Sequence, residues 1–218
     1  MFSRFLAPLR GRGAEVLFVC APELARLLGG QSKLSRKEFD LWTYAMTVPL
    51  RLGATLETTP PPTRLPVAWR GGNGVGVMAT GNPNFAKHAQ RTPPEAVQAE
   101  LLSLGRDLRP EATGAQDFLD TAEIVAGLDL VITIDTAMAH LAASLGAPTW
   151  ILLPAVDADW RWLRNRTQSP WYPQARLFRQ PAPDDWAGAL EQVKAALAAA
   201  PPPAFSQAAA GSATSTDQ

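Results

Sequence analysis

The clearest fold signal in the chain is Leu128-Asp129-Leu130-Val131-Ile132-Thr133-Ile134-Asp135-Thr136-Ala137-Met138-Ala139-His140. Residues 128–134 are apolar at almost every position, which is typical of a strand buried on both faces of a parallel sheet. A helix is expected to begin directly after this strand, with Asp135 or Thr136 as its N-cap. The stretch therefore predicts a strand-to-helix junction at the carboxyl edge of an α/β sheet, where such folds bind ligands.

The sequence on either side repeats this alternation of apolar strands and helices from residue 67 to residue 200. Prolines and glycines separate the segments, and Gly146 is positioned to end the helix that follows Thr136. The pattern predicts an α/β domain with a parallel sheet covered by helices. The expected strands are Gly74–Ala79, Leu128–Ile134 and Pro148–Leu153, and the expected helices are Pro94–Leu104, Asp117–Ala126, Thr136–Leu145 and Trp186–Ala199.

Residues 1–66 form a separate unit that ends in the proline-rich stretch Thr58–Pro66, the best linker candidate in the chain. We therefore divide the chain into a partial N-terminal lobe over 1–66 and a C-terminal lobe over 67–200. A tail over 201–218 follows, in which we expect disorder because Pro, Ala, Ser and Thr dominate it. The elements expected in the N-terminal lobe are the helix Phe2–Leu9, the strand Glu15–Cys20, the helix Pro22–Leu28, and a short strand followed by a helix within Phe39–Leu52.

The composition argues against several functional classes. The 20 Lys and Arg residues balance 20 Asp and Glu residues, which argues against a general nucleic-acid or membrane-surface binder. The one cysteine, Cys20, excludes an internal disulfide and a Cys-cluster metal site, and two histidines disfavour a His-rich zinc centre. No stretch approaches the roughly 18 apolar residues of a transmembrane segment, and none fits a secretory signal. These observations predict a soluble, cytoplasmic protein.

The helix expected after Asp135 has the properties of an anion site. Its first turn points unpaired backbone N–H groups out of the carboxyl edge of the sheet, and the helix dipole adds positive potential there. Small side chains at Ala137 and Ala139 leave the approach open. The junction favours a phosphate group as ligand, and the same pattern also fits a residue that only caps a structural helix.

These residues also carry a resemblance to a known family, which extends over nearly the whole globular part of the chain. The similar strings are Asp117–Ala122, Leu128–His140, Trp150–Pro154, Asp159–Leu163, Ser169–Pro173 and Arg176–Gln180, with weaker matches at Gly81–Asn84 and Phe39–Leu41. In these strings the chain resembles the heptosyltransferase-like glycosyltransferases, glycosyltransferase family 9, and most of all a TPR-linked bacterial branch that includes flagellin-modifying enzymes.

The resemblance implies a GT-B fold, in which two Rossmann-like lobes face each other and the C-terminal lobe holds a nucleotide-sugar. It implies that Thr136, Ala137 and Met138 offer amides to the diphosphate, and that Asp135 and His140 shape the pocket. It also implies inverting transfer of the sugar to a hydroxyl of a glycan or protein acceptor, such as lipopolysaccharide core or flagellin, without a metal or other cofactor. The alternative is a non-catalytic or truncated module that binds a nucleotide-sugar or a partner.

A second group of candidates follows the expected strand Gly74–Ala79 and so lies at the same edge of the sheet. Asn82 and Asn84 could donate hydrogen bonds to a sugar or phosphate, and Lys87 and Arg91 could neutralise charge on the leaving diphosphate. Asparagines beside Gly and Pro are also common turn formers, so the two asparagines have a purely structural alternative.

An aromatic segment follows the strand Pro148–Leu153. It suggests a surface for sugar stacking or, equally, packing of the C-terminal helix. Asp157 and Asp159 match the D-x-D motif of metal-dependent sugar transfer. We interpret this match as coincidental because the resembled family needs no metal. The candidate contacts to sugar or acceptor are Asp159, Trp160, Arg161, Trp171 and Tyr172.

No catalytic base is assigned from the sequence. Members of the resembled family carry a carboxylate in a Gly-Asp loop of the N-terminal lobe, and Met1 aligns just after that loop, so this lobe is expected to be truncated. Asp40 and Glu57 are the carboxylates considered as substitutes. We therefore expect the 218-residue chain to transfer sugar poorly.

Overall fold

A five-stranded parallel sheet forms the centre of the computed structural model, which describes residues 1–35 and 39–199. The strand order is β2-β1-β3-β4-β5, one of the common doubly wound orders. In this order the chain reverses direction across the sheet between β1 and β3, and ligands bind at such a switch point. The strands are β1 (Val75–Met78), β2 (Arg106–Asp107), β3 (Leu130–Ile134), β4 (Thr149–Leu153) and β5 (Ala175–Arg179).

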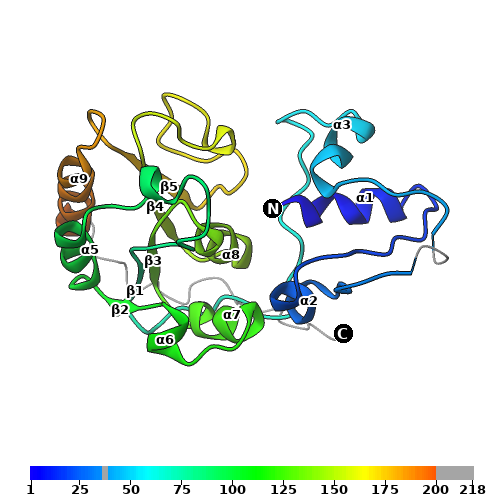
Figure 1. Ribbon diagram of the computed structural model, residues 1–218, viewed down its shortest axis with the longest axis horizontal. Helices are drawn as coiled ribbons and strands as arrows, with labels where there is room; N and C mark the ends of the chain where they lie inside the picture. Colours follow the sequence, from blue (N-terminus) through cyan, green and yellow to red (C-terminus); the bar gives the residue numbers. More distant parts are fainter. Residues whose placement is uncertain (36–38, 200–218) are drawn as a thin grey trace, which may run out of the picture.

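Helices cover both faces of the sheet (Figure 1). On one face, α5 (Glu95–Leu102) and α9 (Trp186–Ala199) bury apolar side chains against β1, β3 and β4. On the other face, α7 (Phe118–Ala126) and α8 (Ala137–Leu145) pack together. All five residues of β3 are buried, so β3 is the strand around which the two layers assemble.

The core elements of the C-terminal part confirm the sequence predictions. The three expected strands are present as β1, β3 and β4, and the expected helices are present as α5, α7, α8 and α9. Thr136 is the N-cap of α8, because its side chain accepts a hydrogen bond from the Met138 N–H. Gly146 ends α8 with φ of 91°, a left-handed conformation that glycine adopts without strain.

Two strands were not predicted, and each has a physical reason. β2 contains two residues, too few for a periodic pattern. β5 carries Arg176 and Arg179, so its apolar run is broken. The Arg176 guanidinium lies over the rings of Trp150 and Phe178, 5.7 Å and 4.7 Å from their centroids, which lets a charged residue occupy the sheet. The short helices α4 (His88–Arg91), α6 (Pro110–Thr113) and η3 (Trp160–Trp162) were also not predicted.

Residues 1–35 and 39–66 contain helices but no sheet. The helices expected at Phe2–Leu9 and Pro22–Leu28 are confirmed, whereas the strands expected at Glu15–Cys20 and within Phe39–Leu52 are wrong. Glu15–Cys20 is extended, but its pairing is limited to one bridge between Val19 and Gln31. The elements are η1 (Phe2–Phe5), α1 (Leu6–Arg10), α2 (Pro22–Leu28), η2 (Ala45–Thr47) and α3 (Val48–Leu52).

The N-terminal region contacts the sheet domain at two places. In α2, Leu27 joins the core around α7, and the Arg26 guanidinium lies 2.7 Å from the Asp117 carboxylate. In η1, the buried Arg4 donates hydrogen bonds to the carbonyls of Pro60 (3.0 Å) and Trp171 (3.1 Å). Figure 1 shows α2 beside α7, while α1 and α3 lie on the far side from α5 and α9.

Two further predictions concern the boundary between the two lobes and the C-terminal tail. The division into lobes at residue 66 stays a prediction, and the tail over 201–218 lies outside the described residues. Across the described ranges, no helix is both long and apolar enough to span a bilayer.

We predict that Gly105→Ala destabilises the fold. A Cβ at Gly105 would meet the Val75 carbonyl oxygen and lie 2.9 Å from Val75 C, and backbone in β1 cannot give way. We expect a loss of about 1–3 kcal/mol, the usual cost of overpacking, seen as a lower midpoint in thermal unfolding. Gly11→Ala is the matched control, because its Cβ would meet no atom closer than 3.5 Å. Equal midpoints for the two variants would contradict the register of β1 and β2.

Candidate functional site

The candidate site is the junction between β3 and α8. Thr136 has extended backbone angles, φ −137° and ψ 178°, and its Oγ1 accepts the Met138 N–H at 3.2 Å. The Ala137 N–H has no acceptor among the described residues, and the Ala137 side chain is exposed. The positive end of α8 therefore presents one unpaired amide to an approaching anion.

Arg91 brings a positive charge to the same junction. Its Nη1 donates a hydrogen bond to the Asp135 carbonyl oxygen at 2.9 Å, and its guanidinium lies 4.0 Å from the centroid of the Phe85 ring. Gly81, in the loop after β1, allows this approach. A Cβ there would lie 3.1 Å from Thr136 Cγ2 and 3.4 Å from Arg91 Nη2. The carboxyl ends of β1 and β3 thus meet at the switch point, and both supply candidate residues.

The other predicted residues of the β1 loop lie on its surface. Asn82 Oδ1 accepts the Asn84 N–H at 2.9 Å, which is the turn geometry given as the alternative for these asparagines. Both side chains are exposed, as is Lys87 at the start of α4. The structure therefore places Asn82, Asn84 and Lys87 in the same loop as Arg91, while Arg91 is the one that contacts the junction.

Asp135 is half-buried, and its surroundings shift the pKa of its carboxyl group. Burial raises the pKa of this carboxyl, and the nearby Asp159 carboxylate raises it further. The indole N–H of Trp162, Arg91 and Arg161 oppose the shift. The Trp162 Nε1 atom nevertheless forms no hydrogen bond of standard geometry. Asp135 therefore lies between the loop after β1 and the loop after β4.

His140 is held inside the protein behind the start of α8. Its ring stacks on Trp162 with a centroid distance of 5.1 Å and an interplanar angle of 11°, and its Nδ1 lies 3.1 Å from the Tyr172 hydroxyl. Burial lowers the pKa of His140 to about 3, and the positive charges of the chain's amino terminus and Arg161 add to the effect. At neutral pH His140 is uncharged, so it shapes the site through packing.

The aromatic segment after β4 divides into one exposed ring and several buried ones. Trp160 is 56% exposed, whereas Trp162, Trp171 and Tyr172 are buried. Trp171 Nε1 donates to the Arg161 carbonyl oxygen at 2.7 Å. Trp171 and Tyr172 are buried, but they pack with residues of α8, β4 and β5, so the expectation that they pack the C-terminal helix is wrong. Trp160 is the ring of this segment that a sugar could reach.

Asp159 has a structural role in this segment. Its carboxylate caps η3 by accepting the Arg161 N–H at 2.9 Å, and it forms an ion pair with the Arg161 side chain at 2.6 Å. Asp157 is exposed, with a left-handed φ of 56°. Within residues 1–35 and 39–199, no group of three or more His, Cys, Asp or Glu side chains could hold a metal ion.

Besides Arg91, which the sequence predicted, this edge contains three buried donors that sequence reasoning missed. In the described part of the chain, four buried side-chain polar atoms lack a hydrogen-bond partner, and all four are nitrogens. They belong to segments that follow β1 and β4 or end β5, so all lie toward the carboxyl edge of the sheet. The atoms are Arg91 Nε, Trp162 Nε1, Arg179 Nε and Gln180 Nε2.

Arg179 also fixes the shape of the loop after β4. It donates hydrogen bonds to the carbonyl oxygens of Trp162, at 2.9 Å, and Leu163. Leu163 has φ of 53° and ψ of −179°, angles that residues other than glycine rarely adopt. The sequence signal for this role was the similar string Arg176–Gln180, but its residues had no assigned contact because β5 was not predicted.

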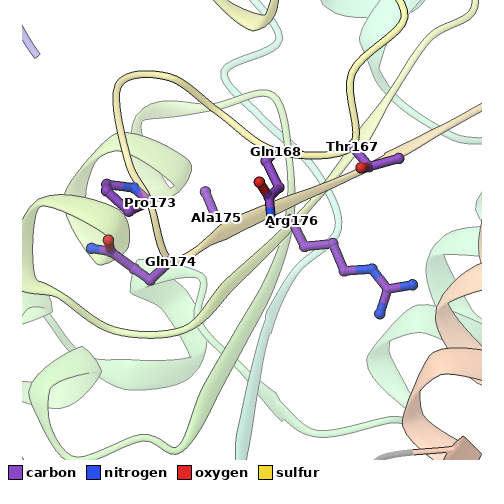
Figure 2. Close-up of a pocket in the computed structure, with 6 residues that line it drawn as sticks. All are labelled: Thr167, Gln168, Pro173, Gln174, Ala175 and Arg176. Atoms are coloured by element: carbon purple, nitrogen blue, oxygen red, sulfur yellow. The ribbon is translucent and has the colours of Figure 1, made fainter.

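Two hollows in the described structure lie away from this junction. One, of about 260 Å³, is lined by polar residues at the start of β5, at the opposite end of that strand (Figure 2). The other, of about 590 Å³, follows residues 42–51 of the N-terminal region. Figure 2 shows Arg176 directed away from Pro173 and Gln174, so the polar side chains that line the smaller hollow do not converge on a common position.

Comparison with known protein families, with curated proteins and with solved structures finds no match for this chain.

We predict that His140 contributes to acid instability. Because its pKa is about 3 when folded and near 6.5 when unfolded, the unfolded state binds the proton between these values. Stability is therefore lost as pH falls below about 6.5, by up to about 1.4 kcal/mol per pH unit from this group. Denaturant unfolding between pH 4.5 and 7.5 measures the slope.

His140→Gln should flatten that slope, whatever its effect on stability at pH 7.5. His88→Gln is the control, because it changes the chain's other histidine and leaves His140 in place. If both variants keep the wild-type slope, the buried, neutral placement of His140 is incorrect.

Proposed function

We propose that the chain binds a nucleotide-sugar and is a glycosyltransferase in which the sheet domain corresponds to the nucleotide-binding lobe of a GT-B fold, with the diphosphate held at the junction of β3 and α8. The second Rossmann-like lobe of such a fold has no counterpart in the described residues of 1–66, which contain no sheet. The observation that carries this proposal is the placement of Arg91 on the Asp135 carbonyl, beside the unpaired Ala137 amide. A guanidinium and a helix N-terminus are both suited to phosphate oxygens, and here they lie at the switch point of the sheet. The resemblance of residues 117–180 to glycosyltransferase family 9 supports the same ligand.

The proposed chemistry is an inverting transfer. An acceptor hydroxyl oxygen attacks the anomeric carbon of the donor and releases its proton to water, while the bond from that carbon to the nucleoside diphosphate breaks. Negative charge develops on the leaving diphosphate, and the proposal assigns Arg91 and the Ala137 amide to its stabilisation. The acceptor is a hydroxyl of a glycan or protein.

A second candidate function is a non-catalytic nucleotide-sugar-binding module. The observation that favours it is that desolvation lowers the pKa of the partly buried His140 to about 3, which makes it a weak base, and that its Nδ1 lies 3.1 Å from the Tyr172 hydroxyl. His140 is therefore not placed to accept a proton from an acceptor. Release of nucleoside diphosphate from the donor, measured with and without glycan or protein acceptors, separates the enzyme from the binding module.

The sharpest test of the proposed site is Ala137→Pro. Proline is favoured at the first position of a helix, and the extended Thr136 before it is already compatible, so the variant removes one amide and keeps the helix. We expect weaker binding of a nucleoside diphosphate by about 1–3 kcal/mol in calorimetry, the cost of losing a hydrogen bond to a charged group. Arg91→Gln should weaken binding by a similar amount.

The control is Glu95→Pro, at the equivalent first position of α5, where the exposed side chain lies outside the site. It should bind like the wild type. Unchanged affinity in both Ala137→Pro and Arg91→Gln would place the ligand elsewhere.

We further predict that binding needs no divalent cation. Arg91 and α8 supply positive potential at the junction, and Asp159 is already paired with Arg161. Titration of UDP-, ADP-, GDP- and CMP-sugars in excess EDTA should give the affinities measured with magnesium. A large loss of affinity in EDTA would instead indicate that Asp157 and Asp159 bind a metal ion.

A further inference from the structure

Phe85 is a large aromatic residue on the surface of the loop that follows β1. It is 47% exposed, and it belongs to none of the three apolar clusters of the core. A single exposed apolar residue is ordinary in a folded protein, so exposure alone assigns Phe85 no role. The role of this residue follows from what its ring contacts.

The Phe85 ring lies against the side chain of Arg91. The guanidinium carbon of Arg91 is 4.0 Å from the ring centroid, well inside the limit of about 6 Å for a cation–π contact. The backbone of the loop holds the ring in place. The Phe85 N–H donates to the Asn82 carbonyl at 3.1 Å, and the Phe85 carbonyl accepts the His88 N–H at 2.8 Å. The guanidinium therefore rests on a surface that its own loop has fixed.

Two contacts together set the orientation of the Arg91 guanidinium. Its Nη1 donates to the Asp135 carbonyl oxygen at 2.9 Å, and the Phe85 ring covers one of its faces. A single hydrogen bond would leave the planar group free to turn about the line between donor and acceptor. A ring against the face of the group removes that freedom, so the remaining donors of Arg91 point in a defined direction.

The Nη2 atom of Arg91 is the donor that this arrangement leaves available. It forms no hydrogen bond to a described residue and is not among the buried atoms that lack a partner, so it is open to solvent. Gly81 leaves room in front of it, because a Cβ there would lie 3.4 Å from Nη2. Within residues 1–35 and 39–199, Arg91 also forms no ion pair, so its charge is not neutralised.

We propose that Phe85 is a positioning residue that holds the Arg91 guanidinium ready for the anion bound at the junction of β3 and α8. This inference rests on the proposed function. An arginine that is free in solvent loses rotamer freedom when it binds an anion, whereas one already held by a ring has less freedom to lose. A ring also stabilises the cation without supplying a carboxylate that would compete with the diphosphate. Arg161, which is paired with Asp159, shows the contrasting arrangement.

Calorimetric titration of the full chain with inorganic pyrophosphate, ADP, UDP and GDP tests the proposal. Phe85→Leu should raise the dissociation constant of every probe that binds by roughly three- to tenfold, because the guanidinium loses its support. Phe85→Tyr keeps the ring and should bind like the wild type. Trp42→Leu is the matched control, since it removes a ring that is 70% exposed in the N-terminal region. The thermal midpoint of Phe85→Leu should stay close to that of the wild type.

A double-mutant cycle tests whether Phe85 acts through Arg91. When Arg91→Gln is already present, adding Phe85→Leu should cause no further loss of affinity, whereas independent roles would multiply the two losses. Three results would overturn the positioning role and leave the proposed function standing. They are wild-type affinity in Phe85→Leu, an undiminished further loss in the double variant, and a loss for the nucleotides but not for pyrophosphate. A wild-type chain that binds none of these probes would overturn the proposed function and this inference with it.

Discussion

The complete burial of β3 organises the sheet domain and its carboxyl edge. β3 pairs with β1 on one side and β4 on the other, and helices cover it on both faces. Because every residue of the strand is buried, its length and direction are fixed, and the chain leaves the core at Asp135. The functional candidates at Asp135, Thr136 and Ala137 are therefore positioned by hydrophobic packing before any polar contact is made.

The elements predictable from the sequence are those with both a clear period and clear ends. α8 has an N-cap in Thr136 and a left-handed Gly146 at its end, and both signals are local. β5 was missed because its two arginines are accommodated by groups that are distant in sequence: Arg176 lies over the Trp150 ring, and Arg179 donates to the carbonyl oxygens of Trp162 and Leu163. The segment Glu15–Cys20 was mispredicted for a related reason. Its side chains favour a strand, but a strand exists only where another backbone can pair with it.

The candidate site was predictable to the extent that it follows from topology. Arg91 and Thr136 come together because both follow strands that end at the same edge of a parallel sheet. The separate roles of the tryptophans were not predictable, because sequence cannot distinguish the exposed ring of Trp160 from the buried ring of Trp171. The unpartnered nitrogens of Trp162 and Gln180 were missed because hydrogen bonding at a buried atom depends on the tertiary fold.

The arginines at the carboxyl edge of the sheet differ in whether a carboxylate pairs with them. Arg161 is neutralised by Asp159, but Arg91 and Arg179 donate to backbone carbonyls and, among the described residues, form no ion pair with a carboxylate. Removing a guanidinium partly from water without a counter-ion is unfavourable, and carbonyl groups compensate for hydrogen bonds but not for charge. The Nε atoms of both arginines remain unpaired. An anionic, acceptor-rich ligand would supply the missing charge and hydrogen bonds together, and for this reason we propose a diphosphate rather than a neutral sugar alone as the group bound at this edge.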